Sequence, residues 1–125
     1  MAVIEKEIKL MGSKGECERV GLFDSGATYS CIDRDLAKEL EILIPLPGPL
    51  PLETAEAGRM VEVKEAVRLD FYLDGYRFSD EFMVIPDLSS PVIIGAKTMQ
   101  AWRFKLDFEA DEVIIDPRVT RLRLL

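Results

Sequence analysis

The sequence of 125 residues contains no histidine. Without an imidazole side chain, a Ser-His-Asp triad, a Cys-His pair and every histidine-ligated metal site are excluded. General acid or base chemistry must therefore come from carboxylates, lysine, tyrosine or cysteine. The acidic residues between Asp107 and Glu112 lack the glycine and the spacing of a calcium loop, so we interpret them as a solvated turn. No metal and no cofactor are predicted.

The chain has only two cysteines, Cys17 and Cys31, which form neither a C-x-x-C pair nor a zinc pattern. The first seven residues alternate in charge and lack the apolar stretch of a signal peptide. The sequence also lacks a run of about 18 apolar residues, so no membrane-spanning helix and no membrane partner are predicted. We therefore expect two buried or half-buried free thiols and a cytoplasmic protein.

Positive charge is scarce, with 16 lysines and arginines against 23 acidic residues and a net charge of -7. A surface that follows phosphates needs the opposite sign, so nucleic acid is not an expected partner. Only Arg118, Arg121 and Arg123 cluster locally. We interpret residues 118–125 as a C-terminal tail or an edge strand, and residues 1–117 as one domain with a modest core.

Most of the chain shows the patterns of β-strands. Alternating or apolar segments at 4–10, 16–23, 29–32, 60–73, 76–85 and 92–95 are separated by turn residues, among them Asp74-Gly75. Short helices are predicted after Asp33, which can act as an N-cap, and over residues 96–102. A last hairpin is predicted over residues 104–115. Many short strands with regular turns predict an all-β barrel or sandwich.

Alternate prolines occupy residues 45–51, in the sequence Pro-Leu-Pro-Gly-Pro-Leu-Pro. Proline donates no backbone hydrogen bond and favours an extended path. We predict a surface loop without backbone hydrogen bonds here, in preference to a docking site for a proline-recognising partner.

A strongly apolar segment ends at Asp24, Ser25 and Gly26. Apolar flanks place the carboxylate at the edge of the core, and glycine allows a sharp turn and the close approach of another chain. The serine hydroxyl can form a hydrogen bond across such a turn. Taken alone, this tripeptide is more typical of a plain turn than of an active site. Its context is more informative, because two further motifs come later in the chain. The first is a predicted hairpin with its tip near Gly58, and the second is the sequence Ile93-Ile94-Gly95, which is followed by a predicted helix.

This order of motifs, over about residues 3–115, resembles that of the retropepsin-like aspartic proteases, the small dimeric relatives of the pepsins. The resemblance implies a closed β-barrel with two short helices. It also implies that each chain supplies one aspartate, so that the active site forms only at the two-fold axis of a homodimer. It matches Asp24 to the catalytic aspartate and predicts a peptide or protein substrate.

The same resemblance assigns three further groups of residues. Support of the active-site loop is assigned to Ser25, Gly26, Ala27 and Thr28; the flap over bound peptide to Ala57, Gly58 and Arg59; and the strand beneath the site to Ile93, Ile94 and Gly95.

Carboxylate chemistry without histidine is consistent with this resemblance. Two carboxylates close together cannot both ionise cheaply, so the pair holds one proton. The ionised member takes a proton from water while the protonated member polarises the peptide carbonyl. A second hypothesis keeps the fold but makes it a catalytically weak or inactive module for peptide binding or dimerisation. A third hypothesis is an unrelated small β-barrel binding module in which Asp24, Ser25 and Gly26 form only a turn.

Overall fold

The computed structural model describes residues 3–53 and 59–124 of the chain. Its elements are β1 (Val3–Gly12), β2 (Gly15–Asp24), β3 (Cys31–Asp33), α1 (Arg34–Leu40), β4 (Ile44–Glu53), β5 (Met60–Leu73), β6 (Tyr76–Ile85), β7 (Val92–Ile94), α2 (Ala96–Ala101), β8 (Lys105–Asp107), β9 (Glu112–Ile114) and the 3-10 turn η1 (Pro117–Thr120).

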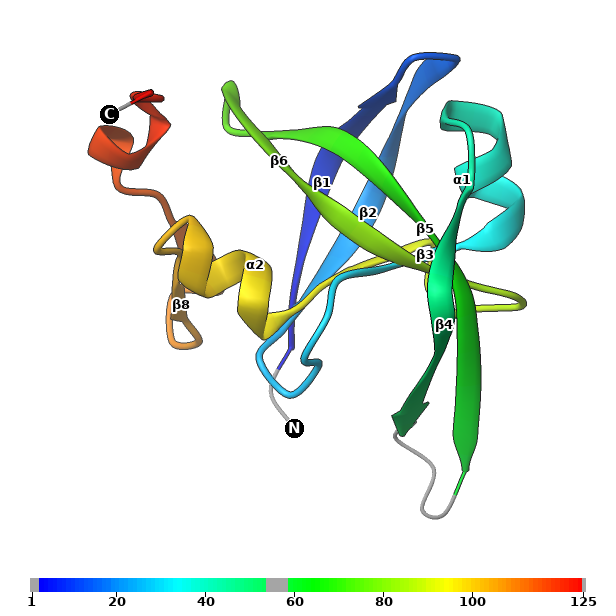
Figure 1. Cartoon of the computed structure of the whole chain (residues 1–125). Coiled ribbons are helices and arrows are strands. Elements are labelled where there is room, and N and C mark those ends of the chain that lie inside the picture. Colours follow the sequence, from blue (N-terminus) through cyan, green and yellow to red (C-terminus); the bar gives the residue numbers. More distant parts are fainter. Residues whose placement is uncertain (1–2, 54–58, 125) are drawn as a thin grey trace.

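Six strands close into a barrel in the order β1-β2-β7-β3-β6-β5, and β5 pairs with β1 to complete the ring (Figure 1). β4 extends the sheet beyond β5 as a flanking strand, and β8 and β9 form a separate two-stranded sheet. The closed β-barrel with two short helices predicted from the sequence is confirmed. Closure satisfies the backbone hydrogen bonds of strands that would otherwise present free edges.

The barrel interior is filled by the apolar face of each strand. Ile4, Ile8 and Leu10 of β1 are buried, as the period-two pattern predicted. The rings of Phe71 and Phe78 pack with centroids 5.4 Å apart, and Phe104 adds an edge-to-face contact to Phe78 at 4.7 Å. Burying one such side chain contributes about 1.5–3 kcal/mol, so this cluster is a main source of stability.

The Asp74-Gly75 turn joins β5 to β6 as predicted, and Leu73 pairs with Tyr76 across it. Both central residues have positive φ, 51° at Asp74 and 81° at Gly75. This is the backbone that a two-residue hairpin of primed type requires, and aspartate and glycine tolerate it better than other residues.

The prediction of a loop without backbone hydrogen bonds over residues 45–51 was wrong. These residues are extended at the surface, but they belong to β4, which pairs with β5 on both sides of a register shift between Pro45 and Leu50. β4 lies at the edge of the sheet, where only one side of the strand needs hydrogen bonds. Proline is tolerated in such a strand because its ring nitrogen faces away from the partner strand or falls in the bulge.

Helix α1 follows Asp33, and its buried face consists of Leu36, Ala37 and Leu40, as predicted. Asp33 occupies the N-cap position, but its side chain makes no capping hydrogen bond. Its carboxylate instead accepts a hydrogen bond of 3.1 Å from the backbone N–H of Leu88. The side chain therefore fixes the turn that leads into β7, a role that the local sequence did not reveal.

The segment after β9 forms the turn η1, and no strand is found in residues 118–124. Asp116 begins this turn, accepting hydrogen bonds from the backbone N–H of Arg118 at 3.0 Å and from its guanidinium at 2.8 Å. Within residues 3–53 and 59–124, no helix is long and apolar enough to cross a membrane. The cytoplasmic location stays a prediction.

Candidate functional site

Asp24 is the last residue of β2 and follows the fully buried Phe23. Its Oδ1 atom accepts a hydrogen bond of 2.9 Å from the backbone N–H of Gly26. Its carbonyl oxygen accepts a second hydrogen bond, of 3.1 Å, from the N–H of Ala27. The half-buried carboxylate is therefore held in a tight turn at the edge of the core. Oδ2 has no hydrogen-bond partner among the described residues and is the oxygen available for chemistry.

Strand β7 lies beside the two arms of the loop that carries Asp24. It runs parallel to β2, with Leu22 opposite Ile93 and Phe23 opposite Ile94. It runs antiparallel to β3, with Cys31 opposite Ile93. The loop at residues 25–30 therefore begins and ends on strands that both bond to β7. Two segments about 70 residues apart in sequence meet here.

Gly95 continues β7 and lies against the backbone of this loop. A Cβ atom at this position would lie 2.5 Å from both the carbonyl carbon and the carbonyl oxygen of Tyr29. It would also lie 2.9 Å from the carbonyl oxygen of Ala27. Only glycine allows so close an approach of two backbones. The glycine of Ile93-Ile94-Gly95 is therefore required by the packing of the loop.

The first turn of α2 binds the same loop through its backbone. The N–H of Ala96 donates to the carbonyl of Ala27 at 2.6 Å, and the N–H of Lys97 donates to the carbonyl of Thr28 at 3.1 Å. These donors would otherwise be unpaired, because the first N–H groups of a helix have no partner within it. The Lys97 ammonium also lies 4.8 Å from the centre of the Tyr29 ring, a cation–π contact.

Two buried hydroxyl groups also hold the loop at residues 25–30 against α2, and the sequence analysis predicted neither of them. The oxygens of Ser30 and Thr98 lie 2.5 Å apart, and the Ser30 oxygen also accepts a hydrogen bond of 2.9 Å from the N–H of Gly95. Both residues are at least 98% buried. The available signal was weak, because a single serine or threonine in a mixed sequence such as Lys97-Thr98-Met99 is also common at the surface.

The other loop residues assigned from the sequence lie near Asp24. Ser25, Gly26 and Thr28 are exposed, and Ala27 is half-buried. Ser25 also borders a cavity of about 510 Å³ whose other walls come from α2 and from residues 103–106. The exposed hydroxyl of Ser25 makes no hydrogen bond within the part of the chain that the structure describes. It is therefore free to contact a second molecule.

The hairpin predicted to carry the flap is formed by β4 and β5. Glu53 pairs with Met60, and the strands extend well beyond the barrel in Figure 1. Ala57 and Gly58 lie outside the described residues. Arg59 is exposed, next to the first residue of β5. The structure therefore places the base of the predicted flap and not its tip.

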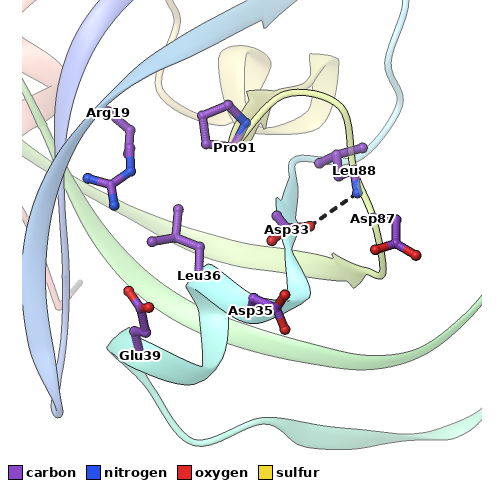
Figure 2. Close-up of a pocket in the computed structure, with 8 residues that line it drawn as sticks. All are labelled: Arg19, Asp33, Asp35, Leu36, Glu39, Asp87, Leu88 and Pro91. Atoms are coloured by element: carbon purple, nitrogen blue, oxygen red, sulfur yellow. Dashed lines mark hydrogen bonds between the residues drawn. The ribbon is translucent and has the colours of Figure 1, made fainter.

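A second cavity, of about 480 Å³, lies beside α1, away from Ser25 (Figure 2). Its lining consists of Arg19, Asp33, Asp35, Leu36, Glu39, Asp87, Leu88 and Pro91. Four of these residues are acidic, and the Asp33 carboxylate is bonded to the Leu88 N–H. Within residues 3–53 and 59–124, no three His, Cys, Asp or Glu side chains are placed so that they could hold a metal ion together.

The cysteines do not offer a nucleophile at this site. Cys31 and Cys17 are free thiols, buried and half-buried respectively, as expected. Burial raises the pKa of Cys31 to about 11, so its thiol stays protonated at neutral pH. Burial also raises the pKa of Cys17. Trp102 packs against Phe78 and donates a hydrogen bond of 2.9 Å to the Ser79 carbonyl.

No protein-family model and no curated protein sequence matches the chain. Among solved structures, the fold is similar to that of the retroviral protease-like domain of Ddi1 from Leishmania major. The TM-score is 0.67 at 18% sequence identity, and the match covers 93% of this chain and 90% of the other. The chain therefore has a retropepsin-like fold over nearly its whole length.

Proposed function

We propose that two copies of this chain form an aspartic endopeptidase, with Asp24 of each copy at a shared two-fold axis. The observation that carries the proposal is the position of Asp24. Its carboxylate ends β2 directly after the fully buried Phe23, is fixed through one oxygen by Gly26, and lies on a loop bonded to β7 and α2. Asp24 is the one carboxylate in this position among residues 3–53 and 59–124, so in this proposal an isolated copy holds half of the machinery.

Two-fold symmetry supplies the second carboxylate, because Asp24 of the other copy occupies the symmetry-related position. Two carboxyl groups that lie side by side at the axis share one proton, because two negative charges so close together repel each other strongly.

In the proposed reaction, the ionised carboxylate accepts a proton from a water molecule, which attacks the carbonyl carbon of the substrate peptide. The protonated carboxyl donates a hydrogen bond to the carbonyl oxygen, where negative charge develops. The tetrahedral intermediate then collapses, the peptide C–N bond breaks, and a carboxyl group supplies the proton to the leaving amine. No covalent enzyme intermediate is formed. Ser25 and Gly26 are proposed to brace the two loops and to border the substrate backbone.

Cleavage of a peptide library tests this function. We expect cleavage at mildly acidic pH and a loss of at least about 100-fold in Asp24→Asn. The amide keeps an oxygen that can accept the Gly26 hydrogen bond, so the variant is expected to fold. Asp35→Asn makes the same chemical change on the exposed face of α1 and should cleave as the parent does. Equal cleavage by Asp24→Asn and the parent would show that Asp24 is not catalytic.

Sedimentation tests whether the chain forms the proposed dimer. A chain that stays monomeric at high concentration would contradict a shared site. A dimer that binds peptides but cleaves none, in the parent as in Asp24→Asn, would favour the inactive peptide-binding module instead.

A further inference from the structure

Strand β2 has partner strands along the whole of one side and along only part of the other. β1 pairs with β2 over its full length, whereas β7 pairs only with residues 21–23. No other strand of residues 3–53 and 59–124 pairs with β2. Residues 16–20 therefore form an open sheet edge, and such an edge is a template for the addition of a further strand.

The backbone of this edge points outward at alternate residues. Bonded and non-bonded pairs alternate along an antiparallel ladder, and a two-residue turn, such as the one that joins β1 to β2, closes with a bonded pair. Glu16, Glu18 and Val20 therefore direct their N–H and C=O groups away from β1. The Glu18 carbonyl agrees with this direction, because it accepts a hydrogen bond of 2.8 Å from the Arg19 guanidinium and not from a strand. Arg19 thus takes the place of a partner strand's N–H group.

The α1 cavity, which is the cavity of about 480 Å³ shown in Figure 2, opens beside this edge, and Arg19 lines it from β2. Its volume lies in the range of ligand-binding pockets. The wall opposite Arg19 is fixed by Asp33, whose Oδ1 atom accepts from the Leu88 N–H at 3.1 Å and whose own N–H donates to the Pro91 carbonyl at 3.0 Å. The α1 cavity therefore needs little ordering when a ligand binds.

Acidic side chains border the α1 cavity on two elements. Glu39 extends from α1 and Asp87 from the connection between β6 and β7, and both are exposed (Figure 2). Among the described residues that line the cavity, Arg19 is the only basic one. The α1 cavity therefore suits a cationic ligand, and the net charge of -7 favours the approach of such a ligand.

The opposite face of the edge favours a different side chain. Side chains alternate across a strand, so Val20 lies on the face opposite to that of Arg19, and 47% of its surface is exposed. A β-branched residue on an added strand would pair well with it. The next residue of that strand would point to the α1 cavity, where lysine or arginine meets the acidic side chains. A ligand that suits both faces therefore alternates between these two residue types.

We infer that β2 binds an extended segment of a partner protein in which lysine or arginine alternates with β-branched residues. The segment adds a strand at residues 16–20, displaces the Arg19 guanidinium from the Glu18 carbonyl, and directs its cations toward Glu39 and Asp87. Main-chain hydrogen bonds then supply affinity, and the side chains supply selectivity. The inference does not depend on the proposed function, because none of the residues assigned to the proposed active site lines the α1 cavity.

A fluorescent peptide of four Lys-Val repeats is the probe, and its binding is followed by fluorescence anisotropy. We expect saturable binding that is at least about 10-fold weaker for four Glu-Val repeats, since the charge is then reversed. A peptide of four lysines followed by four valines keeps the composition but loses the alternation, and it should also bind at least about 10-fold less tightly.

Methylation of the peptide's backbone nitrogens tests strand addition without any change in the protein. Alternate nitrogens of an added strand face β2, so methylation of one alternate set should weaken binding at least about 10-fold and methylation of the other set should not. Equal effects of the two sets would overturn the strand addition.

Glu39→Gln with Asp87→Asn removes two acidic charges from the α1 cavity and should weaken binding at least about 5-fold. Asparagine tolerates the positive φ of 55° at Asp87. Asp111→Asn with Glu112→Gln is the matched control, because it makes the same change in charge on the β8–β9 hairpin and also places asparagine at a φ of 55°. This control should bind as the parent does.

Arg19→Ala should tighten binding about 3-fold, because it frees the Glu18 carbonyl and removes a like charge. Circular dichroism of every variant verifies the fold. Binding that is lost in Asp24→Asn and kept in the Glu39 and Asp87 variant would place the peptide at the proposed active site and overturn the docking inference. A parent chain that binds the Lys-Val and Glu-Val peptides equally, or binds neither, would also overturn it. Cleavage by the parent and by Asp24→Asn reports separately on the proposed function.

Discussion

The hydroxyl oxygens of Ser30 and Thr98 lie 2.5 Å apart in the interior, although 68 residues separate them in sequence. Ser30 ends the loop that begins at Asp24, and Thr98 lies on α2. The pair therefore fixes the far end of the candidate catalytic loop to the helix, while the Gly95 N–H is bonded to the same serine.

Removing one of these hydroxyls is expected to destabilise the protein. Ser30→Ala leaves the Thr98 hydroxyl and the Gly95 N–H without a partner in a dry environment, which costs about 1–3 kcal/mol. Thr98→Val keeps the shape and should cost a similar amount. The double variant should lose less than the sum of the two, because the second change removes a group already unpaired.

Denaturant unfolding of the three variants measures this coupling. Thr28→Ala is the control, because it removes an exposed hydroxyl from the same loop and should change the free energy of unfolding by less than about 0.5 kcal/mol. Strictly additive losses in the Ser30 and Thr98 variants would show that the two hydroxyls do not interact.

Gly95→Ala should destabilise the fold through the backbone of the candidate catalytic loop. The added methyl would lie 2.5 Å from two backbone atoms of Tyr29, which cannot move aside as a side chain can. Overpacking of this kind costs about 1–3 kcal/mol or more. Gly48→Ala is the matched control, since a Cβ there meets nothing within 4 Å. We expect a lower melting temperature for Gly95→Ala and little change for Gly48→Ala. Equal melting temperatures would contradict the close approach.

Stability at acid pH should depend on Glu41, which follows α1. Its carboxylate accepts hydrogen bonds from the Ser13 hydroxyl and from the backbone N–H groups of Ser13 and Ile42, at 2.8 and 3.0 Å respectively. These bonds lower the pKa of Glu41 from 4.5 to about 2. The folded state thus binds this proton less readily than the unfolded state does. The stabilisation is complete above about pH 4.5 and is lost as the pH falls toward 2.

Urea unfolding between pH 2 and 6 measures this contribution. Glu41→Gln should flatten the acid side of the stability curve, whereas Glu39→Gln, on the exposed face of α1, should leave the slope as it is. An unchanged slope in Glu41→Gln would rule out the link to Ser13. Because this loss begins below about pH 4.5, cleavage assays above that pH are made with the Glu41 contribution to stability intact.

The strands and turns followed from local patterns in the sequence. The long strand at 60–73 matches β5 at both ends, and Asp74-Gly75 forms the expected turn. Alternation and turn chemistry act over a few residues, so they are visible without the fold. The proline segment was wrongly predicted to be a loop. A strand tolerates proline only on a side that has no hydrogen-bonded partner strand, and the local sequence does not show which side that is. The partner strand of the proline segment, β5, begins only at Met60, beyond that segment.

The candidate site could be predicted in part. Asp24 and Gly95 stand out in the sequence because an apolar segment ends at each of them. The contact between their two segments could not be derived from spacing, since it depends on β7 pairing with both β2 and β3. The same holds for Asp33, whose sequence position predicts a helix cap and whose carboxylate instead binds the turn before β7.

The sequence by itself determined that this chain forms a β-rich domain, that histidine is not available for acid-base chemistry, and that Asp24 is the residue to examine. Those conclusions depend on composition and on short-range periodicity. Only the tertiary structure decided how the loop at Asp24 is fixed, through Gly95, Ser30 and Thr98, and that a cavity lies between Ser25 and the β8–β9 hairpin. These features arise where segments far apart in the chain meet, and such contacts exist only once the barrel has closed.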